Sequence, residues 1–545
     1  MVHPVRIGLI VDDRSVTRWQ AEGLLRLRGR YDVILYSCTN SRPGLRSTKH
    51  ALYYLLNLCT IRNRWTQRIP LPSDFPLAGE VGFEAGRDGA WQVIPDWLLD
   101  RIAEDDPAVI LKFGMGLLRV AEADRLAPPI LSFHHGDPRS FRGRPAGFYE
   151  MLEGADRLGQ VVQVLSNHLD AGDVAAFAET RIHTHSYRKT LIEAFSVSPL
   201  LVEKAITNVL SRQTARFQPG KSYRLPSNRQ VIAFCSKLLR NAASRLFYGA
   251  FLEKRWRVAR AEAGTSNPSD AIDNFPPIGR WEIEPTPRGY AFLADPFFHP
   301  GGRGFLAEGL SKSTSAGAIL HVVNGETTPL SDGHAHWSYP ATHSQGGAHF
   351  LIPEMSEAGP AGLFRLTDNR LERVAGFSVE GNPRLIDPTL FPHEGRFYLF
   401  ANRLEEGPGV LRLWVSEELA GHYNEHPKSP VRISPAGSRM AGNIVSHAGS
   451  LWRFGQDFTA EYGNGIFLFE IESLSALDYR EVECSRRRFA EVRGPHTVNF
   501  NGSQILFDFY TDRLSALAGL RRLISFRRSR RHARLSGRTD HANIG

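Results

Sequence analysis

The feature that most constrains the fold is a repeat in the second half of the chain. Each repeat has a short strand, a turn with glycine, and an apolar or aromatic strand. The five segments are "ADPFFHPGGRGFLAE", "SYPATHSQGGAHFLIPE", "DPTLFPHEGRFYLFAN", "GNIVSHAGSLWRFGQ" and "GPHTVNFNGSQILFDF". Their turn glycines, Gly301, Gly347, Gly395, Gly449 and Gly502, are 46, 48, 54 and 53 residues apart. Blades of this length predict an all-β five-bladed propeller over residues 253–515. A two-sheet sandwich is the alternative, but it would not need the repeat.

Polar residues recur at matching places in these repeats. Seven positions after the turn glycines lie Glu308, Glu354, Asn402, Gln456 and Phe509, and before the turns lie Asp295, Tyr339, Asp387, Asn443 and His496. Because the first strands of propeller blades face the central axis, these side chains predict a polar pocket there. We expect Asp295, Glu308, Glu354 and Asp387 to bind substrate. The alternative is that the Asp-Pro and Gly-rich elements only shape turns.

The first 185 residues follow a different pattern. The apolar runs "VRIGLIV", "YDVILYSC" and "APPILSF" read as buried strands, and segments with helical spacing lie between them. Strands that alternate with helices predict an α/β, Rossmann-like domain over residues 1–185. Residues 186–252 read as a helical connector, with Ser227 and Gln230 forming a capping box.

Charge and cysteine content bound the partners and the compartment. Of the net charge of +9, +7 lies in residues 521–545, so the body of the protein shows no nucleic-acid footprint. Residues 516–545 read as a basic, disordered tail; contact with an anionic membrane or polymer is the alternative. The four cysteines form no CxxC pair, and no stretch reads as a signal peptide or a membrane span. We expect a cytoplasmic protein.

Two adjacent histidines precede an Arg-Gly turn in "SFHHGDPRSFRGRP", residues 132–145. Zinc binding by His134, His135 and Asp137 is one interpretation. However, neighbouring residues on a strand point to opposite faces, and no cysteine assists, so we expect no metal site. A plain polar loop is the other alternative.

This stretch, together with "LGQVVQVLSNHLDAGDVAA", resembles the folate-dependent formyltransferase family over roughly residues 1–185. The family's hallmark is Asn-x-His before a turn that ends Tyr-Arg-Gly, followed by Leu-Asp-x-Gly. Here the matching segments are Ser132-Phe133-His134, Phe141-Arg142-Gly143 and Leu169-Asp170-Ala171-Gly172. The resemblance implies that 10-formyltetrahydrofolate donates a formyl group to an amine.

The resemblance also implies site residues. His134 would donate a hydrogen bond to the developing oxyanion, and Asp170 would orient it and accept the amine proton. Ser132 stands where the family has asparagine, a second oxyanion donor. Either His135, Asp137 or a main-chain N–H compensates, or the domain is weak or inactive. The cofactor would lie along the strand-end loop formed by Phe113, Gly114, Met115 and Gly116.

The second half resembles two groups of five-bladed propellers. One is the arabinanase- and levansucrase-type glycosidases, in which an aspartate of an "ADP"-like segment is a catalytic base. The other, closer in pattern, is the N-terminal propeller of plant glucosamine inositolphosphorylceramide transferases. Asp295, Glu354 and Asp387 fall on the shared segments. We expect the propeller to bind sugar, with hydrolysis as the alternative.

Together these observations predict a formyltransferase that acts on an amino sugar or sugar nucleotide in surface polysaccharide synthesis. Acceptance of transfer RNA is less consistent with the sequence, because the body lacks a basic face. The alternative from another class is an inactive formyltransferase fold that serves as a glycan-binding scaffold.

Overall fold

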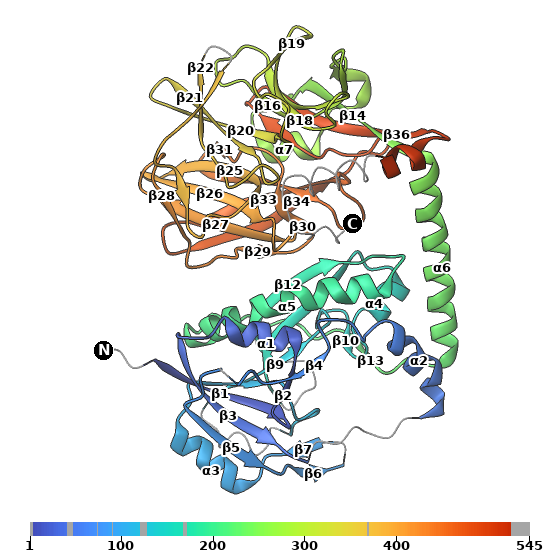
Figure 1. The fold of residues 1–545 in the computed structure, drawn as a ribbon, viewed down its shortest axis with the longest axis vertical. Coiled ribbons are helices and arrows are strands. Elements are labelled where there is room, and N and C mark those ends of the chain that lie inside the picture. The colour runs from blue at the N-terminus through green and yellow to red at the C-terminus, as the bar shows by residue number, and fades with distance from the viewer. Residues whose placement is uncertain are drawn as a thin grey trace. The chain divides into compact units, whose positions relative to one another are not determined.

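The computed structural model describes residues 4–40, 47–73, 75–89, 91–119, 128–166, 172–367 and 370–524. The chain divides into two compact units, Met1–Ala242 and Ala243–Gly545, each of which is described by itself (Figure 1). Among these residues, no helix has both the length and the apolar character that a bilayer span requires.

The first unit is built on a nine-stranded sheet. Its parallel strands, in spatial order, are β5 (Gly79–Phe83), β3 (Tyr31–Cys38), β1 (Val5–Asp12), β8 (Val109–Lys112) and β9 (Ile130–His134). Antiparallel strands β11 (Arg157–Val164) and β12 (Val174–Arg181) extend the sheet beyond β9, and β2 (Ser15–Thr17) and β4 (Arg68–Pro70) extend it from the end of β1. Strand order reverses between β1 and β8, and ligands of such sheets bind outside the carboxyl ends of the strands at this point.

Helices and short ribbons complete the first unit. The helices are α1 (Arg18–Leu25), η1 (Thr48–His50), α2 (Ala51–Cys59), α3 (Asp96–Asp105), α4 (Phe148–Glu153) and α5 (Tyr187–Leu210). The ribbons pair β6 (Gly86–Asp88) with β7 (Trp91–Val93), and β10 (Arg142–Gly143) with β13 (Ser222–Tyr223). The predicted alternation of strands and helices is therefore present.

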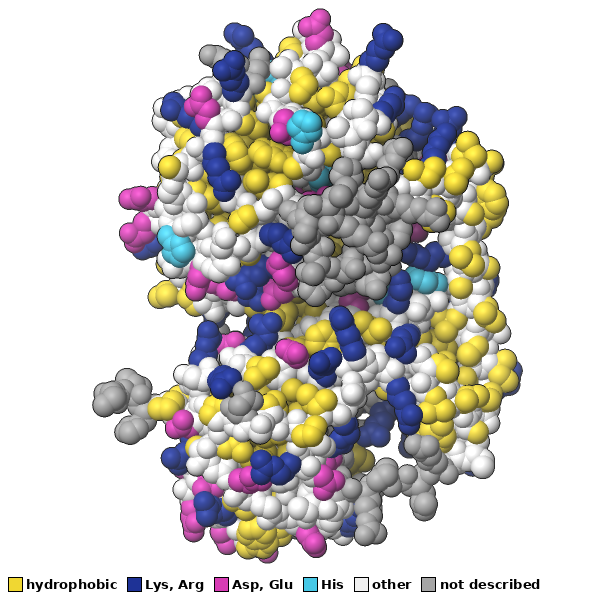
Figure 2. Space-filling view, viewed as in Figure 1, with side chains coloured by type: hydrophobic (Ala, Val, Ile, Leu, Met, Phe, Trp, Pro, Cys, Tyr) yellow, Lys and Arg dark blue, Asp and Glu magenta, His cyan; other side chains and the backbone are white. Residues whose placement is uncertain are grey.

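The segment predicted as a connector, residues 186–252, contains two helices with different surroundings. Helix α5 packs against β11, β12 and α1, so its apolar residues belong to the core of the first unit. Helix α6 (Asn228–Phe251) runs from the first unit into the second. Ser227 and Gln230 form the predicted capping box at its start, with Ser227 N–H donating to Gln230 Oε1 at 2.8 Å. Leu239 and Leu246 are exposed on this helix, where Figure 2 shows apolar side chains.

The second unit is the predicted five-bladed propeller. The first blade comprises β16 (Tyr290–Phe298), β17 (Phe305–Ser311), β18 (Gly317–Val323) and β19 (Glu326–Pro329). The second comprises β20 (Ser338–Gln345), β21 (Ala348–Glu354), β22 (Phe364–Thr367) and β23 (Arg370–Arg373). The third comprises β25 (Leu385–His393), β26 (Arg396–Arg403), β27 (Val410–Ser416) and β28 (His422–Glu425), with β24 (Ser378–Val379) and β29 (Arg432–Ile433) at its edges. The fourth comprises β30 (Ala436–Met440), β31 (Val445–His447), β32 (Ser450–Asp457), β33 (Gly465–Leu474) and β34 (Tyr479–Arg487).

The fifth blade closes the ring with strands from both ends of the unit. It pairs β35 (Val498–Phe500) and β36 (Gln504–Leu514) with β14 (Leu252–Glu262) and β15 (Glu282–Ile283), and α7 (Pro268–Asp273) and η3 (Ile278–Arg280) lie between the last two in sequence. Strand β14 pairs with β36 along its whole length. Such closure leaves no open edge between the first and last blades.

The tail predicted to be disordered begins with helical residues, 518–524. Ala518 is fully buried, Gly519 lies against Ala250, and Arg521 forms an ion pair with Glu253 at 3.0 Å. These contacts hold the start of the tail to the second unit, and the rest of the predicted tail, 525–545, lies outside the described residues.

Candidate functional sites

The carboxyl ends of β1 and β8 meet at the switch point of the first unit. The side chain of Asp12 accepts a hydrogen bond from Met115 N–H at 2.9 Å, which fixes the loop after β8. Gly114 is required there, since a Cβ would approach Asp12 Oδ1 to 2.6 Å and the main chain of Val11 to 2.7 Å. The close approach predicted at Gly114 is therefore to the protein's own chain.

The other predicted cofactor residues have separate surroundings. Phe113 packs against Trp19 and Phe133, with ring centroids 5.6 and 5.8 Å apart, and Met115 is fully buried. Gly116 is exposed, and among the described residues a Cβ there would meet Gln92 Oε1, at 3.6 Å, and nothing closer. Of the four, Gly116 is thus the residue whose main chain has room beside it for a flat ring, as far as the described residues extend.

Strand β9 separates the two neighbouring histidines. Ser132 and His134 are two residues apart on this strand and therefore share one face of the sheet, and Phe133 lies on the other. His135, the first residue after the strand, stacks with Phe133 at a ring-centroid distance of 6.5 Å and so lies on the side of Phe133. This geometry is incompatible with a zinc site that uses both histidines through one face.

His135 belongs to an aromatic cluster. Its ring centroid lies 4.5 Å from that of Phe195 and 5.6 Å from that of Trp19. Its Nε2 is 3.0 Å from Ser198 Oγ, which itself donates to Gln160 Oε1 at 2.7 Å, so His135 is the donor of this pair. Burial, with a smaller contribution from His134, lowers the pKa of His135 to about 3. His135 is therefore a neutral packing residue.

His134 lies on the opposite face at the carboxyl end of β9. It is buried at 9 % exposure, with Nε2 3.2 Å from the main-chain oxygen of Phe141, in the Arg-Gly turn. Ser132 pairs in register with Lys112 of β8 and with Gln163 of β11. Lys112 is buried and donates to Gly116 O at 2.8 Å. The sheet thus places a hydroxyl, an imidazole and an ammonium on neighbouring positions.

Two further predicted residues complete the account of this unit. Asp137 forms hydrogen bonds and an ion pair with Arg139, at 2.8 to 3.1 Å, and is thereby engaged. Asp170, predicted as the partner of His134, lies outside the described residues.

At the propeller axis, three inner strands share a distortion. Asp295, Tyr339 and Asp387 have φ values of 48°, 46° and 46°, and the strand register shifts around each of them. A left-handed residue that is not glycine costs free energy and persists only where surrounding contacts enforce it. The distortion turns these side chains and main-chain N–H groups toward the axis.

Carboxylates of the second strands hold these distorted residues. Glu354 Oε2 accepts from Asp387 N–H of the next blade at 3.2 Å. Asp508 Oδ2 accepts in the same way from Asp295 N–H at 3.0 Å, which links the fifth blade to the first. Both carboxylates therefore have an interblade structural role.

His496 connects two of the axial carboxylates. Its Nδ1 lies 3.1 Å from Asp508 Oδ2 and 3.3 Å from Asp295 Oδ1. Burial alone would lower the pKa of His496, but the two carboxylates outweigh burial and raise it to about 10. Burial opposes ionisation of Asp295, yet His496 and the Thr497 hydroxyl bring its pKa below the ordinary value. A charged triad thus closes the ring.

Arg439 balances the charge of a second group of axial acids, Asp387 and Glu354. It forms a two-pronged ion pair with Asp387 and approaches Glu354 Oε2 at 3.5 Å. Gln456 Nε2 donates to Asp387 Oδ2 at 2.7 Å. Burial raises the pKa of Asp387, and Arg439 opposes this effect. The oxygens of Asp387 are consequently engaged by protein donors.

Glu308 differs from the other axial acids. Among the described residues, the nearest side chain that can pair with it is the His336 imidazole, at 3.7 Å, and no hydrogen bond to its carboxyl is found in that part of the chain. Burial, with the Asp295 and Glu354 carboxylates, raises its pKa well above the ordinary value. Of the four predicted substrate-binding residues, Glu308 alone has a carboxyl that is not already committed to protein hydrogen bonds among the described residues.

An aromatic side chain borders this end of the axis. Tyr462, between β32 and β33, is 39 % exposed, and its ring centroid lies 4.6 Å from that of His496. The Arg439 guanidinium lies 5.1 Å from the Tyr462 ring centroid. Tyr462 therefore offers an apolar ring face next to the charged cluster.

The structure corrects two alignments made from the repeats. In the fourth blade, Gln456 donates to Met440 O. Arg439, which precedes Met440, occupies the position that Asp295 and Asp387 occupy in their blades. The fourth-blade counterpart of these two aspartates is therefore Arg439 and not Asn443. In the fifth blade Asp508, and not the counted Phe509, is the axial residue, because it accepts from Asp295 N–H and His496 N–H, whereas Phe509 packs against Trp281. Arg439 and Tyr462 were not identified from the sequence; a glycine-anchored alignment has no signal for either.

Comparison with known proteins gives matches over the propeller. A family model described as "Glucosamine inositolphosphorylceramide transferase 1, N-terminal" matches residues 308–506. The protein named glucosamine inositolphosphorylceramide transferase 1 from Arabidopsis thaliana is 30% identical over 223 residues, 38% of this chain and 29% of its own length. Its namesake from Oryza sativa subsp. japonica is 30% identical over 215 residues, 36% of this chain and 29% of its own length. The chain therefore spans less than a third of the length of these relatives.

Solved structures were also found by fold comparison. Glycinamide ribonucleotide transformylase 1 from Symbiobacterium toebii matches 40% of this chain and 96% of its own, with a TM-score of 0.27 and 13% identity. A formyltetrahydrofolate deformylase from Burkholderia mallei matches 39% of this chain and 70% of its own, with a TM-score of 0.27 and 16% identity. Scores this low carry no argument about activity.

Proposed function

We propose that the chain is a 10-formyltetrahydrofolate-dependent N-formyltransferase whose acceptor is an amino sugar or a sugar nucleotide, and that its propeller binds the carbohydrate. The observation that carries the proposal is the placement of Ser132 and His134. They share one face of β9 at the strand end, beside the switch point, while His135 is committed to the opposite face. This is the pair that the formyltransferase resemblance assigns to the developing oxyanion.

The chain's own residues would act as follows. The folate, when bound, supplies the formyl group, and the open main chain at Gly116 is where its ring would fit. His134 and Ser132 would donate hydrogen bonds to the oxygen that gains charge as the amine attacks, and Lys112, next to Ser132, adds positive charge. This ammonium group would compensate for the oxyanion donor that is missing because Ser132 stands where the family has asparagine.

The acceptor class is supported by the charge at the propeller axis. Five carboxyl groups, those of Asp295, Glu308, Glu354, Asp387 and Asp508, are gathered with only two cationic side chains, Arg439 and His496, among the described axial residues. An ammonium group beside Glu308 would relieve the repulsion that raises its pKa. The ring face of Tyr462 and the carboxyl of Glu308 together fit a cationic sugar. The names of the propeller's relatives include glucosamine, which is an amino sugar.

The test is an assay of formyl transfer by the full chain, with 10-formyltetrahydrofolate and a panel of free and nucleotide-linked amino sugars. Release of tetrahydrofolate is followed by absorbance, and the formamide product by mass spectrometry. We expect transfer to at least one amino sugar and none to the matching sugar without the amine. Folate turnover that does not depend on the amine would contradict the proposal.

Glycoside hydrolysis by the propeller is the second candidate. Glu308 has a raised pKa and Asp295 a lowered one, which is the split between a proton donor and an ionised carboxylate that such chemistry uses. Asp295 Oδ1, however, already accepts from Thr497 at 2.6 Å. Slow release of reducing sugar by the wild type, lost in Asp295→Asn, would favour hydrolysis.

A further inference from the structure

A hollow lies further along the inner strands of the propeller, away from the charged cluster of axial residues. The inner strands run from the charged cluster toward it: Phe298 and Thr342 each follow their blade's distorted residue by three positions, about 10 Å along the strand. Asn443 and Asn499 complete the inner wall from the fourth and fifth blades. The hollow has a volume of about 390 Å³, within the range of about 300–1,000 Å³ of small-molecule sites.

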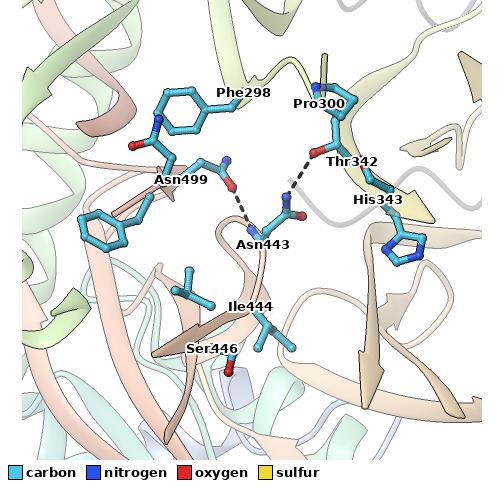
Figure 3. A pocket seen from close by; sticks show the side chains of 12 residues that line it. Phe298, Pro300, Thr342, His343, Asn443, Ile444, Ser446 and Asn499 are labelled. Atoms are coloured by element: carbon cyan, nitrogen blue, oxygen red, sulfur yellow. Dashed lines mark hydrogen bonds between the residues drawn. The ribbon is translucent and has the colours of Figure 1, made fainter. Parts of the chain in front are cut away.

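The polar groups of this hollow are held in place. The Asn443 main-chain N–H donates to Asn499 Oδ1 at 2.9 Å, and Asn443 Nδ2 donates to Thr342 Oγ1 at 3.2 Å, as Figure 3 shows. Asn499 Nδ2 in turn donates to Pro296 O at 2.8 Å. The preceding Gly442 permits this arrangement, because a Cβ there would lie 1.9 Å from Val498 O. The amides are therefore fixed before any ligand arrives, which lowers the entropic cost of binding.

Asn443 Oδ1, in a residue that lines the hollow, is buried and has no hydrogen-bond partner within the described protein. A buried polar atom without a hydrogen bond costs free energy, so this oxygen is a place where a ligand hydroxyl would be stabilised. His343 also lines the hollow, but its ring lies against that of Phe397, with centroids 6.1 Å apart. Burial lowers the pKa of His343, and the imidazole is therefore neutral near pH 7.

Among the described residues, the lining has no acidic or basic side chain apart from this histidine. Phe298 and Phe500 contribute apolar surfaces, and amides and hydroxyls contribute both donors and acceptors. An anion or a cation would find no counter-charge here. A ring with an apolar C–H face and several hydroxyls matches both kinds of surface.

We propose that this hollow is a carbohydrate-binding site for an uncharged hexopyranose unit, separate from the acidic end of the axis. At this site the propeller would bind a neutral sugar, whatever ligand binds at the charged cluster of axial residues. It does not depend on formyl transfer.

The probes are the methyl glycosides of glucose, galactose and mannose, added to the full chain and followed by saturation-transfer NMR and titration. Ser446→Tyr fills the hollow from an exposed lining position, and Phe500→Ala removes one aromatic wall. We expect each variant to weaken binding at least about tenfold, the loss of roughly one hydrogen bond or aromatic contact. Ser313→Tyr, the same change in an exposed turn of the first blade, should bind as the wild type does.

Three results would overturn the proposal. They are absence of binding of all three glycosides to the wild type, unchanged binding in Ser446→Tyr with a normal melting temperature, and an equal loss of binding in Ser313→Tyr. If one hollow variant fails to fold, as its melting curve would show, the other decides the question.

Discussion

The roles of neighbouring polar residues are determined in different ways in the two candidate sites. In the α/β unit, strand alternation assigns Ser132 and His134 to one face, and ring contacts with Phe133 and Trp19 assign His135, just after the strand, to the other. At the propeller axis, similar acids come from several blades, and their roles depend on which donors the neighbouring blades offer. A motif on one strand can therefore be interpreted locally, whereas a ring of equivalent positions cannot: Asp508 accepts hydrogen bonds that close the ring, while the Glu308 carboxyl has none among the described residues.

The largest effect that this contrast predicts is on stability. Asp508→Ala removes the acceptor of three main-chain N–H groups, those of Asp295, His496 and Thr497, and leaves the His496 charge underpaired. Losing one partner of a buried pair typically costs about 3–5 kcal/mol, so we expect a loss of this size in the free energy of unfolding. Asp512→Ala, further along the same strand, is the control; it loses a surface hydrogen bond from the Tyr248 hydroxyl and should cost no more than about 1 kcal/mol. Equal losses in chemical denaturation would show that Asp508 has no special role in closure.

The second-largest predicted effect is on activity, and it distinguishes His134 from its neighbour His135. His134→Ala should lower formyl transfer by about 10²–10³, the usual cost of one oxyanion donor, without a matching loss of stability. His135→Phe keeps an aromatic ring in the cluster but loses the bond to Ser198, so it should lower the melting temperature and retain turnover. Steady-state kinetics and thermal unfolding of both variants check the assignment. The reverse pattern would exchange the roles of the two histidines.

Glu308 and Glu354 provide the corresponding contrast at the axis. Glu308→Gln should weaken binding of an amino sugar by about 10- to 150-fold, the equivalent of one charge-assisted hydrogen bond of about 1.5–3 kcal/mol. Glu354→Gln removes the charge that faces Arg439 and should instead lower stability more than affinity. Calorimetric titration and melting curves separate the two effects. If Glu354→Gln lost more affinity than Glu308→Gln, the division between structural and available acids would be wrong.

Taken per pH unit, the smallest predicted effect is a dependence of stability on pH. The folded pKa of His496, about 10, lies above the value of about 6.5 for an unfolded histidine, so its contribution is complete below pH 6.5 and is lost as pH rises toward 10. The free energy of unfolding should therefore fall over this range, with a slope of at most about 1.4 kcal/mol per pH unit from this group. Asp508→Ala, which removes one of its carboxylate partners, should flatten the profile. A wild-type profile that stays level from pH 6.5 to 10 would contradict the charged triad.

Local patterns account for what could be predicted from the sequence. The glycine spacing specified five blades, and the Ser227–Gln230 box specified the start of α6, because both depend on short-range geometry. The axial partners could not be predicted in the same way. Arg439 replaces an aspartate at its position in the fourth blade, and Asp508 is one residue away from its counted position, so alignment by turn glycines misplaced both.

Glycine is a second instance of this limit. Gly114 was expected to admit a ligand, but its missing side chain admits the end of β1 instead. A sequence shows that a close approach is needed at a glycine; it does not show which group approaches. The polar hollow beneath the charged cluster was likewise not predicted, since Thr342, Asn443 and Asn499 are brought together only by closure of the ring.

The most direct test of the central claim, that the α/β unit is a folate-dependent enzyme, is calorimetric titration of the full chain with a stable analogue of 10-formyltetrahydrofolate. The account predicts saturable binding at one site, retained in His134→Ala because this residue acts on the developing oxyanion more than on the bound folate. A bulky substitution at the open main chain, Gly116→Leu, should abolish it. No binding to the wild type at millimolar analogue would contradict the account and favour a glycan-binding scaffold.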